Sequence, residues 1–281
     1  MERREFVKKA GVGLLAVSTA SALNSNGLYG NTSIKNGKSD LFKLSFAGYT
    51  FRDYDLDATL EMMQRIDAHH LCIKDFHLPL TATREEIVAF HAKLADRNVT
   101  GCGVGPIYMR SEDEIDRAFE YIRRTGLKLL VGVPDYELLP YVDKKVKEYD
   151  VHYAIHTHGP DVPLYPDSDD VIRHVKDLDP RIGICMDIAH TVRCGSDPVR
   201  DLKKYRKRIF DIHLTDTYEA SKQGQLCTLG RGIVDIPAFV RTLRKVKYNG
   251  FCNIELTANK ENCFASAAES IGYIKGVVDA L

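Results

Sequence analysis

The chain has 281 residues, of which 39 are basic and 39 acidic, so its formal net charge at neutral pH is zero. Nucleic-acid-binding proteins typically have a strong excess of basic residues, which this chain lacks. The balanced charge favours a small neutral or acidic ligand. The length suffices for one large α/β domain or for two smaller domains.

The first 22 residues have the pattern of an export signal. Two arginines at the third and fourth positions are followed by Phe6, by two lysines and by a short, weakly apolar segment. This pattern predicts an exported protein, and the paired arginines resemble the twin-arginine type of signal. We therefore expect a periplasmic protein from which residues 1–22 have been removed. The alternative is an ordinary amphipathic helix at the N-terminus.

Residues 23–40 are rich in Asn, Ser, Gly and Lys, which predicts a flexible leader, and the folded domain is expected at residues 41–281. Within this domain, short apolar runs alternate with longer charged segments of helical periodicity. The apolar runs predict eight strands: Lys43–Gly48, His70–Asp75, Val99–Gly105, Lys128–Val133, Val151–Thr157, Ile182–Asp187, Ile209–Leu214 and Phe251–Leu256. The charged segments predict eight helices: Asp57–Ala68, Arg84–Arg97, Ser111–Arg124, Glu137–Tyr149, Ser168–Leu178, Asp197–Arg206, Ile236–Val246 and Asn262–Ala280.

Local signals support the start of two of these helices. Thr83 and Ser111 each stand three residues before a glutamate, at Glu86 and Glu114, which is the pattern of a capping box. His91 lies on the apolar face of the second predicted helix, so we interpret it as a core or interface histidine and not as a ligand.

Eight strands that alternate with eight helices predict a parallel sheet with helical crossovers. A closed (β/α)₈ barrel and an open doubly wound sheet both fit this order. The domain has the length of a barrel, and no Gly-x-Gly-x-x-Gly follows the first predicted strand. The sequence therefore favours a single (β/α)₈ TIM barrel.

Charged side chains follow the last three predicted strands at their C-terminal ends. Asp187, His213 and Glu255 stand there, and barrel active sites lie at that end of the strands. Two carboxylates and an imidazole are suitable ligands for Mg²⁺, Mn²⁺, Co²⁺ or Zn²⁺. The alternative is that the carboxylates cap neighbouring helices and the histidine satisfies a backbone carbonyl.

Four features follow one another in the second half of the chain: Asp187-x-x-His190, His213, Gly230-x-Gly232-x-x-Asp235 and Gly250-Phe-Cys-Asn-Ile-Glu255. In this order they resemble the xylose isomerase-like TIM barrel superfamily. That superfamily includes sugar-phosphate isomerases and epimerases, ketose 3-epimerases, inosose dehydratases and the barrel-type AP endonucleases. The resemblance covers residues 41–281 and is strongest in the second half of that range. It implies a metal-dependent enzyme for a sugar or sugar derivative.

The resemblance also implies roles for individual residues. Asp187, His213 and Glu255 correspond to metal ligands, and His190 corresponds to a residue that contacts a substrate oxygen. The sugar epimerases have a glutamate as fourth ligand on the fifth strand, whereas this chain has His156 there. An imidazole still ligates a metal.

The exchange of glutamate for His156 affects the expected reaction. A ligating His156 has no lone pair left to act as a second base, which disfavours two-base epimerisation. Isomerisation or elimination through an enediolate needs one base, for which Glu255 is the candidate. His158 or His190 would then transfer a proton between oxygens.

Three further residues are candidates for substrate binding. Lys74 and His77 follow the second predicted strand, with a rim ion pair between Lys74 and Asp75 as the alternative role. Arg231 stands in the loop after the seventh strand, where barrels often bind anions, and a simple turn is its alternative. Gly101–Gly105 lacks the Gly-Lys ending of a phosphate loop and predicts close packing instead.

Together these features predict a divalent-metal-dependent sugar isomerase, epimerase or lyase that uses Mn, Mg, Co or Zn. The alternative, suggested by His156, is a non-catalytic carbohydrate-binding barrel with a degenerate metal site. The neutral charge argues against phosphodiester cleavage and a nucleic-acid partner. We expect no stable membrane insertion after removal of the signal, and the sequence leaves open whether the protein is a homo-oligomer.

Overall fold

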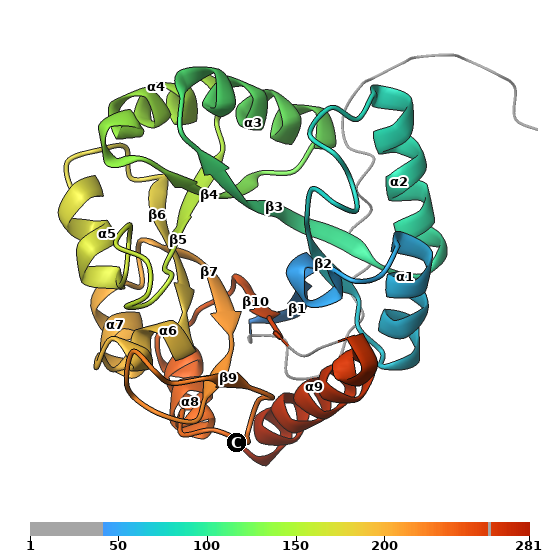
Figure 1. Ribbon diagram of the computed structural model, residues 1–281, viewed down its shortest axis with the longest axis vertical. Coiled ribbons are helices and arrows are strands. Elements are labelled where there is room, and N and C mark those ends of the chain that lie inside the picture. The colour runs from blue at the N-terminus through green and yellow to red at the C-terminus, as the bar shows by residue number, and fades with distance from the viewer. Residues whose placement is uncertain (1–41, 258–259) are drawn as a thin grey trace, which may run out of the picture. The chain divides into compact units, whose positions relative to one another are not determined.

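The computed structural model describes residues 42–257 and 260–281. The predicted signal at residues 1–22 and leader at residues 23–40 lie outside this range. Eight parallel strands of the described residues close into a barrel in the order β1-β10-β7-β6-β5-β4-β3-β2. Figure 1 shows the helices arranged around this barrel. The prediction of a (β/α)₈ barrel is thereby confirmed.

The predicted strands are all present. The barrel consists of β1 (Lys43–Ala47), β2 (His70–Ile73), β3 (Thr100–Met109), β4 (Leu129–Pro134), β5 (His152–His156), β6 (Ile182–Asp187), β7 (Ile209–Leu214) and β10 (Phe251–Ile254). A separate antiparallel pair, β8 (Asp216–Thr217) and β9 (Leu226–Cys227), follows β7 and was not predicted.

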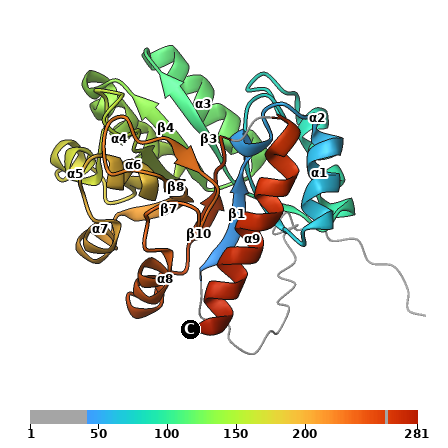
Figure 2. The same ribbon diagram turned by 60° about the horizontal axis from the view of Figure 1, so that its bottom comes forward.

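The predicted helices are also present, with ends shifted by a few residues. They are α1 (Leu56–Arg65), α2 (Arg84–Asp96), α3 (Glu112–Thr125), α4 (Leu139–Tyr149), α5 (Ser168–Val175), α7 (Pro198–Tyr205), α8 (Ile236–Lys245) and α9 (Cys263–Ala280). Figure 2 shows α8 and α9 next to each other on the outside of the barrel, where they are in contact. Shorter elements are α6 (Ile188–Arg193) and the 3₁₀ turns η1 (Gly48–Phe51), η2 (Tyr136–Leu138) and η3 (Lys260–Asn262).

The predicted capping boxes differ in outcome. Thr83 accepts a hydrogen bond from the backbone N–H of Glu86, whose carboxylate accepts one from the backbone of Thr83, so the box is complete. Ser111 accepts from the N–H of Glu114, but that glutamate accepts from Arg110 instead. The second box is therefore only half formed. His91 contacts the carbonyl oxygen of Thr125 between two helices, as expected of an interface histidine.

Strand β3 continues beyond its predicted end. Gly105 has a φ of +122°, and a Cβ on it would lie 2.1 Å from the carbonyl oxygen of Val131. Only glycine allows this approach, which agrees with the expectation of close packing. The register shifts between Val104 and Ile107, and pairing with β4 then resumes as far as Met109. The strand thus carries Tyr108 to the C-terminal end of the barrel.

The described residues contain no helix that is long and apolar enough to cross a membrane.

Candidate functional site

Four potential metal ligands meet at the C-terminal end of the barrel. His156 ends β5, Asp187 ends β6, His213 lies near the end of β7, and Glu255 follows β10. One ligand atom of each lies within 4.8 Å of those of the other three. The parallel register produces this meeting because it sets Asp187 beside His213 on the neighbouring strand.

The distances fit a shared cation. Nε2 of His156 lies 3.0 Å from Nδ1 of His213, which lies 2.8 Å from Oε2 of Glu255. Oε2 of Glu255 lies 3.8 Å from Nε2 of His156. Ligand atoms that surround one divalent ion at about 2.0–2.2 Å are themselves roughly 3–4 Å apart.

Asp187 provides an independent test of the fit. Its Oδ1 accepts hydrogen bonds from the backbone N–H of His190 and from the hydroxyl of Thr215, at 2.8 and 2.6 Å. Its Oδ2 is buried and has no hydrogen-bond partner among the described residues. An unpaired carboxylate oxygen in the interior is costly, and a cation would compensate it. The four residues therefore fit a divalent metal.

The charge of Glu255 also agrees with a ligand role. Burial disfavours its ionised form, but the attraction and hydrogen bonds of His213 and His156 outweigh burial and hold the pKa of Glu255 well below its ordinary value. Burial lowers the pKa of His156, so its imidazole is neutral at neutral pH and offers a lone pair. An ionised carboxylate and a neutral imidazole are the forms that bind metal.

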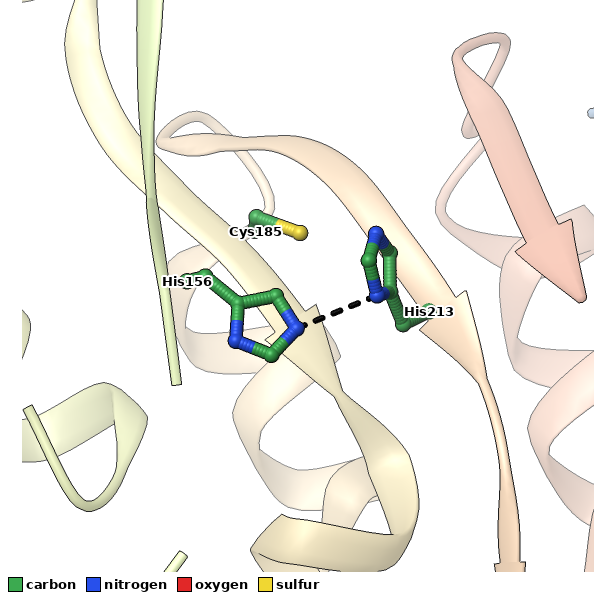
Figure 3. Close-up of side chains that lie close together, drawn as sticks. All are labelled: His156, Cys185 and His213. Atoms are coloured by element: carbon green, nitrogen blue, oxygen red, sulfur yellow. Dashed lines mark hydrogen bonds between the residues drawn. The ribbon is translucent and has the colours of Figure 1, made fainter. Parts of the chain in front are cut away.

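A third type of ligand lies close to the two histidines. Figure 3 shows the thiol of Cys185 beside the facing imidazoles of His156 and His213, and the three also lie within ligand distance of one another. Burial raises the pKa of Cys185 well above that of an ordinary thiol. A metal binds the thiolate form of cysteine, and the raised pKa keeps Cys185 in its thiol form. The ligand set that contains Asp187 and Glu255 is therefore more suitable for a metal than the set that contains Cys185.

Asp211 supports His213 from inside the barrel. This carboxylate is fully buried, accepts a 2.6 Å hydrogen bond from the side chain of Asn253, and lies 3.4 Å from the thiol of Cys185. Its Oδ2 is 3.6 Å from Nε2 of His213. A negative charge on this side favours a proton on Nε2, which leaves Nδ1 of His213 free to face the other ligands.

His158 and His190 flank the four candidate ligands, and their predicted roles in proton transfer and substrate contact stay predictions. Nε2 of His158 lies 2.6 Å from the hydroxyl of Tyr108, and its Nδ1 lies 3.1 Å from the carbonyl oxygen of His156. Nδ1 of His190 lies 3.0 Å from the guanidinium of Arg193. The ring of His190 is 6.5 Å from that of His156.

Lys74, His77 and Arg231 make other contacts. Lys74 forms a 2.8 Å ion pair with Asp75, and His77 lies 3.1 Å from the carbonyl oxygen of Tyr54. The guanidinium of Arg231 pairs with both carboxylate oxygens of Glu269. Within the described residues none of the three contacts the four ligands, and their substrate-binding roles stay predictions.

Two residues near the site were missed in the sequence. Tyr108 lies beyond Gly105, where β3 was expected to end, and its side chain is half exposed. Arg193 lies on α6 and is buried, where it pairs with Asp161 and contacts His190. Helix α6 was not expected because it begins directly after β6, with Asp187 as its N-cap. Tyr108 was missed because β3 extends beyond its predicted end, and Arg193 was missed because α6 was not predicted.

The comparisons with known proteins agree with this architecture. The family model of the xylose isomerase-like TIM barrel matches residues 59–276. No curated protein sequence gave a significant match.

Solved structures share the fold at low identity. An uncharacterised protein from Parabacteroides distasonis is 24% identical, with a TM-score of 0.66 over 85% of this chain and 99% of that one. D-psicose 3-epimerase from Clostridium cellulolyticum, solved with D-tagatose, is 14% identical (TM-score 0.65, 84% and 99% covered). The IOLI protein, solved with a zinc atom, is 18% identical (TM-score 0.63, 84% and 96% covered).

Proposed function

Because this chain belongs to the xylose isomerase-like TIM barrel family, we propose that it is a divalent-metal-dependent enzyme that acts next to the carbonyl of a sugar, through an enediolate. The observation that carries the proposal is the meeting of His156, Asp187, His213 and Glu255 around one point, with a buried and unpaired Oδ2 on Asp187. Two imidazoles and two carboxylates suit Mn²⁺, Co²⁺ or Zn²⁺, and Mg²⁺ less well.

The arrangement supports a reaction with one base. Nε2 of His156 faces His213 and Glu255, so a metal bound there would occupy the lone pair of Nε2. Nδ1 of His156 is buried and has no partner among the described residues. Glu255 is then the base of the site: Oε2 contacts the histidines, and Oε1 has no hydrogen-bond partner in the described part of the chain. One-base chemistry means 1,2-isomerisation, or elimination of water or an alkoxide, and not two-base epimerisation.

A bound divalent cation would polarise the sugar carbonyl and stabilise the negative charge that develops on its oxygen. Glu255 would remove the proton from the neighbouring carbon. His158 donates through Nδ1 to the carbonyl of His156, so its Nε2 accepts the hydrogen bond of Tyr108. Burial lowers the pKa of His158 to about 3, which keeps it neutral. His158 and Tyr108 can therefore pass a proton between substrate oxygens.

The partner of His190 determines its tautomer. Arg193 can only donate, so Nδ1 of His190 accepts and Nε2 carries the proton. His190 is thereby prepared to donate a hydrogen bond to a substrate oxygen. Because Arg193 is buried and tied to Asp161, the imidazole keeps one orientation.

Deuterium exchange tests this function. The full-length protein is stripped of metal, reloaded with Mn²⁺, Co²⁺ or Zn²⁺ and incubated in D₂O with a panel of aldoses and ketoses. We expect metal-dependent incorporation of deuterium at the carbon next to the carbonyl, and a loss of about 10³-fold or more in Glu255→Gln. Glu61→Gln, the same change on the exposed face of α1, is the matched control.

The outcomes separate the two candidate functions. Incorporation that persists without metal, or in Glu255→Gln, contradicts the proposed mechanism. Metal-independent binding of a sugar without any exchange contradicts an enzyme and supports the carbohydrate-binding barrel instead.

A further inference from the structure

The barrel is hollow at the end opposite the four candidate ligands. Its N-terminal mouth is a cavity of about 560 Å³, lined by the first residues of β3, β4, β5, β7 and β10 and by the connections that precede β7 and β10. Small-molecule sites typically have volumes of about 300–1,000 Å³. None of the metal ligands lines this cavity, so it is a separate feature of the molecule.

The charged side chains that line the mouth are all positive. Lys128, Arg206, Lys207 and Lys247 line it, and no Asp or Glu does. The side chains of Arg206, Lys207 and Lys247 form no hydrogen bond or ion pair with the described residues, whereas Lys128 donates only to the carbonyl oxygen of Asp150. In a chain with zero net charge, four cations without a carboxylate create a local positive potential.

A second, smaller hollow extends this positive region. It has a volume of about 270 Å³ and shares Arg206 and Lys207 with the mouth. Lys176, Lys203, Lys204 and Arg208 also line it, again without a carboxylate. Two of these cations have carboxylate partners, Lys204 with Asp169 and Lys176 with Asp177. Arg208 donates to backbone carbonyls and keeps its positive charge. Arg206 and Lys207, which line both hollows, have no carboxylate partner among the described residues.

The floor of the mouth is apolar. Leu129, Ile209, Phe210 and Phe251 line it, together with the thiol of Cys102. The rings of Phe210 and Phe251 are only partly buried and pack against the inward-facing side chains of the barrel. Lys43 lies over the ring of Phe251 at 5.3 Å, which adds a cation at the edge of this floor.

We propose that this mouth binds an amphiphilic organic anion. A flat apolar or aromatic portion would lie on Phe210 and Phe251, and a phosphate, sulfonate or carboxylate group would pair with Arg206, Lys207 and Lys247. A nucleic acid is the less suitable ligand because its backbone would use the cations but leave the apolar floor uncovered. The inference does not depend on the proposed enzymatic function.

The fluorescent probe 8-anilinonaphthalene-1-sulfonate has the required chemistry, an aromatic body and one anionic group. We expect it to bind the full-length protein saturably at one site, with enhanced fluorescence. The double variant Lys207→Glu/Lys247→Glu should weaken binding by about tenfold, since two rim cations become anions. Lys245→Glu is the matched control, because Lys245 is exposed and near Lys247 but does not line the cavity. It should change the affinity by less than about twofold.

The thermal unfolding midpoint and circular dichroism of each variant show whether it is folded. Lys245→Glu changes the net charge by half as much as the double variant does. If it reduced the binding free energy by half as much or more, only overall charge would matter and the proposal would be overturned. Binding of several probe molecules with unchanged affinity in the double variant would do the same. Displacement of the probe by a DNA oligonucleotide whose affinity falls steeply with salt would overturn the proposal, because the ligand of the mouth would then be a nucleic acid and not a small anion.

Discussion

At the level of single residues, the buried carboxylate of Asp211 lies behind the candidate ligand His213. Its Oδ2 is 3.6 Å from Nε2 of His213, and a carboxylate on this side favours a proton on that nitrogen. We predict that Asp211→Asn weakens metal affinity by about 10- to 100-fold, because the amide no longer stabilises the required tautomer. Competition for Zn²⁺ with a chromophoric chelator measures the effect.

The control for this variant is Asp177→Asn, which makes the same change on a side chain that is 87% exposed. Its zinc affinity should equal that of the wild type. An unchanged affinity in Asp211→Asn would mean that His213 is oriented by the backbone alone.

His70, at the start of β2, links stability to pH. Burial, with a smaller contribution from the charge of Lys43, lowers the pKa of His70 to about 4. In the unfolded chain His70 has a pKa near 6.5 and therefore binds a proton at a higher pH than it does in the folded protein. The free energy of unfolding consequently falls as the pH decreases from about 6.5 to about 4. The contribution of this half-buried side chain is about 1–2 kcal/mol after screening by solvent.

Urea unfolding at pH 7 and at pH 4.5 tests this prediction. The loss of unfolding free energy between the two pH values should be smaller in His70→Gln than in the wild type. An equal loss in both proteins would show that His70 does not titrate in this range.

The sequence predicted that the candidate ligands lie together but did not predict the residues that support them, for a physical reason. Asp187, His213 and Glu255 each end an apolar run, and parallel strands bring their ends together, so strand periodicity alone predicts their meeting. Tyr108 acts through a contact with His158, 50 residues further along the chain, and no local pattern in a single sequence shows such a contact. Asp211 lies two residues before His213 on the same strand, but its buried partners Cys185 and Asn253 lie on β6 and β10.

At the level of elements, the loop between β7 and α8 depends on Asp216. Its carboxylate accepts backbone hydrogen bonds from Thr217, Gly230, Gly232 and Val234, at 2.8 to 3.1 Å. A Cβ on Gly232 would lie 2.2 Å from Oδ1 of Asp216. Gly232 is thus needed for the close approach of the loop backbone to this buried carboxylate, whereas Gly230 has a φ of +84° and packs against Tyr273. The sequence showed the motif but not its partner.

We predict that Asp216→Asn loosens this loop, because an amide group cannot accept all four hydrogen bonds and one of its own N–H groups would face another donor. The cost is about 2–4 kcal/mol of unfolding free energy. Hydrogen exchange of the amides at positions 230, 232 and 234 should accelerate by more than about tenfold.

Asp235→Asn is the control for the loop variant. Asp235 caps α8 by accepting from the N–H of Ala238, and Asn is about as good an N-cap as Asp. Exchange at positions 230–234 should remain slow in this variant. Equal acceleration in both variants would assign the effect to α8 and not to Asp216.

Element boundaries were predicted best where hydrophobicity changes abruptly. The bounds of β6 and β7 agree with the prediction because each apolar run is enclosed by charged residues. The end of β3 was wrong because Gly105 and Pro106 are typical of turns, whereas here they lie inside a strand with an irregular register.

At the level of the whole molecule, the four candidate metal ligands connect four of the eight barrel strands, β5, β6, β7 and β10. An ion that binds only when all four are in place stabilises the folded state by mass action, by about 2.7 kcal/mol at a concentration 100 times its Kd. For a domain of this size, we predict that saturating Zn²⁺ or Mn²⁺ raises Tm by about 5–10 °C relative to protein treated with chelator.

Asp187→Asn separates this stabilisation from ordinary packing. The amide retains an oxygen for the hydrogen bonds from His190 and Thr215 but replaces the unpaired Oδ2 with an N–H group that cannot bind a cation. Without metal, the Tm of this variant should lie close to that of the wild type, because a buried, unpaired and charged oxygen is replaced by an uncharged amide of the same shape. Addition of Zn²⁺ or Mn²⁺ should leave the Tm of Asp187→Asn at its metal-free value. A metal-dependent rise in Asp187→Asn as large as that of the wild type would place the ion elsewhere, because this variant removes one of the two carboxylates of the ligand set and preserves the packing of β6.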